Sequence, residues 1–159
     1  MADRNYWLVK SEPETFSFDD LVAAPKQTTH WDGVRNYAAR NHLQAMKKGD
    51  LVLFYHSSAK PAALVGVAEV AREAYPDASA FDKSDSHYDP KSKPEAPSWF
   101  MVDITAVEPL ARQITLDEVK KTKGLENMAL VRLGRLSVQP VTKAEYDTIR
   151  KLAAQKPKG

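Results

Sequence analysis

Leu51-Val52-Leu53-Phe54-Tyr55-His56 is the stretch that decides the fold, together with a second run from Ala63 to Val70. Both runs are rich in β-branched or aromatic residues, which are typical of strands. A short polar turn around Ser58 to Pro61 joins them. The sequence therefore predicts an antiparallel pair of strands at this point.

Further strands are expected on either side of this pair. The candidates are Tyr6 to Lys10, Trp99 to Val107, which alternates as a long strand does, and the closing run Leu136 to Val141. Turns rather than full-length helices bound most of these runs, which favours antiparallel over parallel pairing. The expected fold class is α+β, a bent, mostly antiparallel β-barrel with flanking α-helices.

Capping residues mark the expected helices. They are a short helix from Ser17 and Asp20 to Ala24, Tyr37 to Met46, Thr115 to Lys121, and a C-terminal helix from Thr142 and Glu145 to about Ala154. Two stretches are expected to be loops, Lys26 to Gly33 and the longer, proline-rich Asp77 to Pro97. A loop of about twenty residues inside a compact domain is usually functional or disordered.

Composition narrows the class of protein. The chain has 159 residues, 43% of them hydrophobic, which predicts a single domain over residues 1–159, with 155–159 as a frayed tail. No cysteine is present, which excludes disulfides, thiolate nucleophiles and cysteine-based zinc sites and fits a reducing, cytoplasmic setting. The longest apolar stretch, Leu51 to Tyr55, is too short to cross a bilayer, so no membrane partner is expected.

The stretch Trp31-Asp32-Gly33-Val34-Arg35-Asn36-Tyr37 is the most informative about function. It gathers aromatic, cationic, carboxylate and amide side chains around one glycine. A flat ring held against an aromatic face and recognised at its edge requires this mixture, so the stretch predicts a pocket for a single unstacked nucleobase. The formal net charge is only +2, so such a pocket, rather than phosphate neutralisation alone, must supply the discrimination.

Other segments add candidate residues. The first strand ends at Lys10 and Ser11, and the strand that begins at Leu51 ends at His56 and Ser57. In the long loop, the candidates for a lid or wall are Phe81, Asp82, His87, Tyr88 and Asp89. Arg35, Arg40, Arg132 and Arg135 are candidate phosphate contacts. The histidines and aspartates lack the spacing of a metal site, so no metal and no cofactor is expected.

Several separate motifs closely resemble the EVE domain over about Tyr6 to Ile149. They are Tyr6–Pro13 (YWLVKSEP), Trp31–Tyr37 (WDGVRNY), Gly49–Ser57 (GDLVLFYHS), Val65–Val70 (VGVAEV), Tyr75–Asp77 (YPD) with Phe81–Asp82, and Gly134–Val141 (GRLSVQPV). The resemblance implies a PUA-like fold related to YTH and ASCH modules. It also implies a reader of modified bases in DNA or RNA, and many bacterial members sit beside defence functions, which makes a separate effector protein a candidate partner.

The resemblance to the start of YTH modules implies that Trp31 forms one wall of a base cage and that Asn36 reads the base. The expected function is therefore a non-catalytic module that binds a modified base. The residues expected around the ring are Trp31, Asn36, Asp32, Ser11, His56, Tyr37 and Ser57, and those expected to hold phosphates are Lys10, Arg35 and Arg135. Two alternatives stay open. One is an enzyme acting on a nucleotide or small ligand through His56 or Asp89; the other is a protein-interaction module that binds no nucleic acid.

Overall fold

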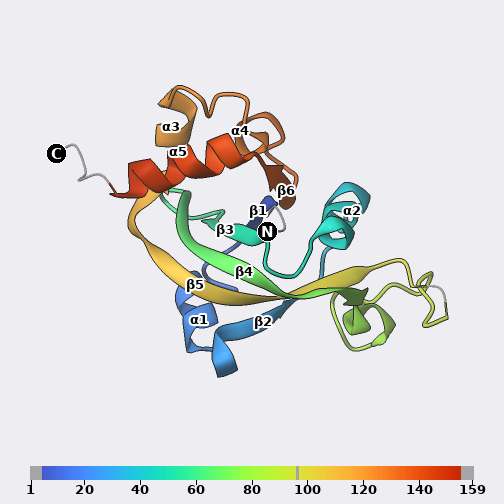
Figure 1. The fold of residues 1–159 in the computed structure, drawn as a ribbon. Coiled ribbons are helices and arrows are strands. Elements are labelled where there is room, and N and C mark those ends of the chain that lie inside the picture. Colours follow the sequence, from blue (N-terminus) through green and yellow to red (C-terminus); the bar gives the residue numbers. More distant parts are fainter. Residues whose placement is uncertain (1–4, 96, 155–159) are drawn as a thin grey trace.

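A strongly curved sheet forms the centre of the protein (Figure 1). The computed structural model describes residues 5–95 and 97–154. Its sheet has six strands in the order β2-β5-β4-β3-β1-β6, with β1 and β3 parallel and the other neighbouring pairs antiparallel. The chain order is β1 (Tyr6–Ser11), α1 (Phe18–Ala23), the 3-10 helix η1 (Pro25–Gln27), β2 (Thr28–Trp31), α2 (Tyr37–Ala45), β3 (Leu51–His56), β4 (Ala63–Pro76), η2 (Ala78–Phe81, also 3-10), β5 (Phe100–Thr115), α3 (Leu116–Lys121), α4 (Ala129–Arg132), β6 (Val138–Val141) and α5 (Lys143–Ala154).

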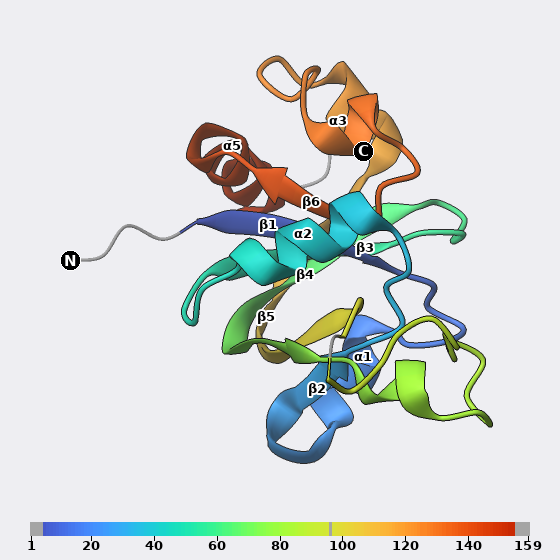
Figure 2. The ribbon, with the colours of Figure 1, turned by 90° about the vertical axis from the view of Figure 1, so that its right-hand side faces the viewer.

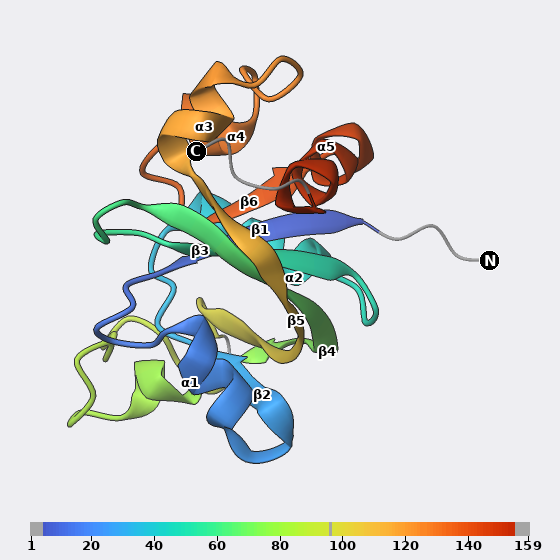
Figure 3. The same ribbon diagram turned by 90° about the vertical axis from the view of Figure 1, so that its left-hand side faces the viewer.

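The central strands β1 and β3 are covered on both faces, which explains why they are apolar runs without polar alternation. In β1, Trp7 and Val9 join a core cluster with α1 and α2, whereas Leu8 between them joins a second cluster with α3, α4 and α5. Successive side chains of a strand point to opposite faces, so one short strand contributes to both clusters. Figure 3 shows α3, α4 and α5 on one side of the sheet and α1 on the other.

The predicted α+β class and the largely antiparallel pairing are confirmed, but the closed barrel is wrong. The edge strands β2 and β6 do not pair with each other among the described residues. The pairing of β4 with β5 shifts register at several points, as at Val70/Arg72 and Arg72/Tyr75. Such irregularities bend and twist a strand. The sheet is therefore bent like a barrel wall and stays open between its edges.

The structure also corrects several expected elements. Thr28–Trp31 was expected in a loop but forms β2. The strand exists because it pairs with β5, from Thr28↔Thr105 to Trp31↔Val102, and local sequence patterns do not predict such long-range pairing. The four-residue helix α4 was not expected at all. The strands β4 and β5 extend to Pro76 and Thr115, well beyond their apolar runs.

The expected helix starts are confirmed at Ser17 and Thr142. Ser17 and Asp20 form the reciprocal capping box of α1, and Thr142 and Glu145 make the same pair of bonds at α5. The expected tail, 155–159, lies outside the described residues. Within 5–95 and 97–154, no helix is long and apolar enough to span a membrane.

The variant Gly66→Ala tests how closely α1 packs against β4. A Cβ atom built at Gly66 would lie 2.5 Å from the ring of Phe18, which is itself 3% exposed and packs edge-to-face on Phe54. We expect Gly66→Ala to lower the free energy of unfolding by about 1–3 kcal/mol, because the enclosed ring must move to make room. Chemical denaturation measures the change. Gly134→Ala is the matched control, since a Cβ there meets nothing within 4 Å; equal stability of the two variants would contradict the prediction.

Candidate functional site

A cleft of about 500 Å³ opens where the two edges of the curved sheet face each other. Trp31 and Asp32 line it at the end of β2, and Ser137 lines it just before β6. Lys10 and Ser11, at the end of β1, complete that second side. Strands that are far apart in the sheet order thus meet around one cavity because the sheet curls.

Trp31 serves both the core and the cleft. Its indole is half-buried and meets Phe54 edge-to-face, with ring centroids 5.4 Å apart and planes at 81°. A second edge-to-face contact joins it to Phe16, at 6.4 Å and 76°. These contacts fix the orientation of the indole while part of its surface stays open to the cavity.

Phe16 is the aromatic residue that the sequence did not single out. It lines the cleft beside Trp31, whereas Phe81 and Tyr88, the expected candidates for a second wall, are not among the lining residues. The one local signal is the position of Phe16 directly before the cap Ser17, where an apolar residue often packs onto the helix it precedes. That signal indicates a helix start and not a cleft.

Lys10 brings a cation to the cleft and is held by its neighbours. Its Nζ donates to the Gly134 carbonyl at 2.6 Å and lies 5.9 Å from the centroid of the Tyr55 ring. Burial lowers the pKa of the Lys10 ammonium from its ordinary value. The neighbouring Ser11 hydroxyl donates to the carbonyl of Phe16, which ties the end of β1 to the segment before α1.

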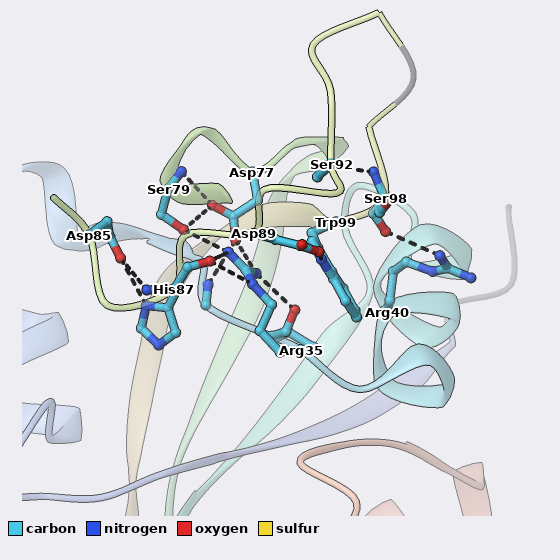
Figure 4. A network of polar contacts seen from close by, with 12 residues as sticks. Arg35, Arg40, Asp77, Ser79, Asp85, His87, Asp89, Ser92, Ser98 and Trp99 are labelled. Carbon is cyan, nitrogen blue, oxygen red and sulfur yellow. Dashed lines mark hydrogen bonds and ion pairs between the residues drawn. The ribbon is translucent and has the colours of Figure 1, made fainter. Parts of the chain in front are cut away.

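Arg35 and Asp77 tie the long loop to the segment after β2 (Figure 4). The Arg35 guanidinium donates to the Asp77 carboxylate at 3.0 Å, to the Ser79 hydroxyl and twice to the His87 carbonyl. The Asp77 side chain is fully buried and that of Arg35 is 22% exposed. Burial raises the pKa of the Asp77 carboxyl, but hydrogen bonds from Ser79, the Gly33 backbone and Arg35 outweigh it and hold the pKa below its usual value of 3.8.

Gly33 allows the loop to close onto this segment. Its φ of +78° lies in the left-handed region that favours glycine, and its N–H donates to Asp77 at 2.8 Å. A Cβ at Gly33 would lie 2.8 Å from the His87 ring, which itself lines the cleft. The loop from Asp77 to Pro97 therefore supplies part of the site through His87 and not through Phe81, Tyr88 or Asp89.

Asn36 and Tyr37 lie beside the cleft without lining it. The Asn36 side chain caps α2 by accepting from the Ala39 N–H at 2.9 Å, which is the structural role open to any asparagine at this position. Tyr37 is 62% exposed and stacks on Trp99, with centroids 5.0 Å apart. Arg40 lies over the Tyr37 ring and donates to the Ser98 carbonyl. These residues form a separate aromatic and cationic surface.

His56 and Ser57 lie next to Ser11 across the β1–β3 pair but are not among the residues that line the cavity. The His56 Nε2 accepts from the Phe18 N–H at 3.0 Å, and burial lowers the pKa of its imidazole while the Asp19 carboxylate opposes that shift. The Ser57 N–H donates to the Ser11 carbonyl. Since the bond from Phe18 occupies its lone pair, His56 is placed to hold the start of α1 rather than to act as a base.

The remaining candidates are spread over the loop and the rim. The Asp89 carboxylate accepts from the Trp99 indole N–H at 2.6 Å, and this bond, with the Lys91 N–H, holds the pKa of Asp89 below its usual value. Arg132 donates to the Asn127 side chain, and Arg135 is exposed in the turn before Ser137. In the part of the chain that the structure describes, no group of three or more histidine, aspartate or glutamate side chains is placed to hold a metal ion.

The curved α+β sheet of this protein defines a fold that is similar to that of a YTH domain. The YTH domain of Zygosaccharomyces rouxii MRB1, solved in complex with N6-methyladenosine RNA, aligns over all of this chain and 90% of its own with a TM-score of 0.56. At 16% identity this likeness is one of fold.

The chain belongs to the EVE domain family, which it matches over residues 5–152. Thymocyte nuclear protein 1 of Rattus norvegicus is 49% identical over 96% of this chain and 75% of its own length. The crystal structure of human THYN1 protein in complex with DNA containing 5-methylcytosine has a TM-score of 0.92 at 45% identity, covering 96% of this chain and 99% of that one.

Asp77→Asn tests the tie between loop and cleft. We expect a loss of about 1–3 kcal/mol of unfolding free energy at neutral pH, because hydrogen bonds to a charged group are replaced by bonds to a neutral amide. The folded-state pKa lies below 3.8, so the contribution of Asp77 is complete above that pH and is lost as pH falls toward the folded value. Denaturant melts over a pH series measure the gap between wild type and variant. A gap that does not narrow below pH 3.8 would contradict the assignment.

Proposed function

We propose that this protein is a non-catalytic module that binds a methylated base of DNA or RNA in the cleft beside Trp31. The observation that carries the proposal is the cleft itself. A half-buried indole borders a cavity of about 500 Å³ whose other walls carry carboxylate, hydroxyl, imidazole and cationic groups. This volume lies within the usual range for small-ligand sites.

The chemistry of the walls suits a single heterocycle. The Trp31 indole offers a stacking surface, which contributes about 1–3 kcal/mol per base in proteins that bind single strands. The exposed Asp32 carboxylate accepts hydrogen bonds, as does the Ser11 hydroxyl, and both line the cavity. A methyl group transferred from water to such a wall adds about 0.8 kcal/mol. Stacking and edge contacts therefore bind the ring, and burial of the methyl group adds the preference for the methylated base.

Family membership supports the same function. The human THYN1 protein was crystallised with DNA containing 5-methylcytosine and shares nearly the whole of this fold at 45% identity. In this proposal Lys10 and Arg135 contact phosphates at the rim, and Arg35 positions the wall because its guanidinium is occupied by the loop. Any cleavage of nucleic acid belongs to a separate effector protein. We further propose a cytoplasmic location. In a cell that has a nucleus, the name of the relative thymocyte nuclear protein 1 favours a nuclear location instead.

Trp31→Ala is expected to weaken binding to oligonucleotides with 5-methylcytosine or N6-methyladenine by about tenfold or more, which corresponds to about 1.4 kcal/mol of lost stacking. Fluorescence anisotropy with matched methylated and unmethylated strands measures the change. Trp31→Phe keeps an aromatic wall and is expected to lose less.

Val107→Ala serves as the control, because Val107 is 48% exposed on β5 and is not a lining residue. Thermal denaturation of each variant separates loss of binding from loss of fold. Equal affinity of the wild-type protein for methylated and unmethylated strands, unchanged in Trp31→Ala, would exclude the proposed function.

Arg135→Gln tests the phosphate rim separately. A phosphate contact contributes equally for all sequences, so we expect binding of methylated and unmethylated strands to weaken by the same factor. The slope of log affinity against log salt is expected to fall in magnitude by about 1, as one fewer counterion is released. A salt titration of both proteins measures it. A variant that loses only the preference for methylated strands would contradict a phosphate role for Arg135.

A further inference from the structure

The turn between α4 and β6 presents an exposed leucine at the rim of the cleft. Leu133 is 53% exposed, although it is a large apolar side chain, and it stands between Arg132 and Arg135, both exposed. The Leu136 N–H donates to the Leu133 carbonyl at 3.1 Å, which closes residues 133–136 into a β-turn. An apolar tip between two cations is thus fixed at one point of the surface.

Buried groups hold this turn from beneath. Gln139, on β6, is fully buried, and its Nε2 donates to the carbonyls of Leu133 and Leu136 at 3.0 and 2.9 Å. The Leu133 N–H in turn donates to the Ala129 carbonyl at the start of α4. The backbone of Leu133 is therefore anchored at both its donor and its acceptor, while its side chain remains exposed to solvent.

The turn adjoins the cleft directly. Lys10, a lining residue, donates from its Nζ to the Gly134 carbonyl at 2.6 Å, and its N–H donates to the carbonyl of Ser137, another lining residue. In Figure 2 the orange segment that follows α4 descends from the helical layer to the sheet at β6, beside β1. The turn that carries Leu133 is thus bonded to the same residue, Lys10, that lines the cavity.

A base of a duplex enters a cleft of this kind only after it leaves the stack, which costs a few kcal/mol of unstacking and unpairing. Proteins that distort duplexes often insert an apolar side chain such as leucine between base steps, which separates the bases, and use basic side chains in the groove beside it. An outward leucine flanked by two arginines, next to a base-sized cavity, has the chemistry of such a wedge.

We propose that Leu133 is a wedge that occupies the stack of a duplex when the methylated base turns into the cleft, with Arg132 and Arg135 on the flanking phosphates. This inference rests on the proposed function and adds that the ligand is a duplex from which the base is extruded. The wedge acts on the duplex alone, since only in a duplex does extrusion of the base leave an unpaired base opposite a gap that the leucine can fill. Leu133 thereby favours duplex over single-stranded ligands and does not affect which base is recognised.

Leu133→Ala is the test, with Val107→Ala as the matched exposed apolar control. The probes are a duplex with one 5-methylcytosine next to 2-aminopurine, whose emission rises on unstacking, and the same methylated strand alone. We expect Leu133→Ala to bind the duplex about tenfold more weakly, equivalent to about 1.4 kcal/mol, and to lose the rise in emission. Its affinity for the single strand is expected to equal that of the wild-type protein.

Any other result contradicts either the role of Leu133 or the proposed function. If Leu133→Ala binds both probes as the wild-type protein does, or if the wild-type protein binds the duplex without a rise in emission, Leu133 is no wedge. The same holds if the variant loses affinity for both probes by equal factors, because the residue then contacts the strand itself. If the wild-type protein shows no preference for methylated over unmethylated probes in either form, the proposed function fails and the wedge fails with it.

Discussion

The curvature of the β4–β5 ribbon is the constraint on which the rest of the structure depends. Fourteen and sixteen residues long, these strands shift register repeatedly and carry the sheet around until β2 faces the β1–β6 side. The edges approach without pairing in the described chain, and the cleft occupies the opening between them. In a fully closed barrel, paired backbone would stand where the cavity is. The failure of the sheet to close is thus what creates the site.

Two buried polar anchors then turn this opening into a defined cavity. On one side, the Asp77 carboxylate collects the Gly33 N–H, Arg35 and Ser79, which fixes the long loop over the segment after β2. On the other side, the Gln139 amide fixes the turn before β6. Losing one partner of a buried ion pair is costly, because the remaining charge keeps its desolvation penalty. The Asp77 carboxylate and the Gln139 amide thus hold the walls of the cavity in place, although neither contacts the ligand in the proposed function.

The sequence predicted much of the fold but only part of the site. Apolar runs and capping boxes located β1, β3 and the starts of α1 and α5, since these signals are local. The strand β2 was missed because its existence depends on pairing with β5. Among candidate residues, the structure places Lys10, Ser11, Trp31, Asp32 and Arg35 around one cavity. Asn36, His56 and Asp89 carry similar chemical groups, but their hydrogen bonds go to the backbone of α1 and α2 or to Trp99.

By itself, the sequence determined the types of most elements, with β2 and α4 as exceptions, together with the absence of cysteine chemistry and the resemblance to the family, because each follows from residue identity and short-range spacing. The tertiary structure alone decided that the sheet stays open and that Phe16, not Phe81, stands beside Trp31. It also decided which candidate of the long loop lines the cavity, namely His87. These features depend on how far a ribbon bends and on which backbone groups a buried carboxylate or amide captures. Both are set by contacts between segments that are distant in the chain.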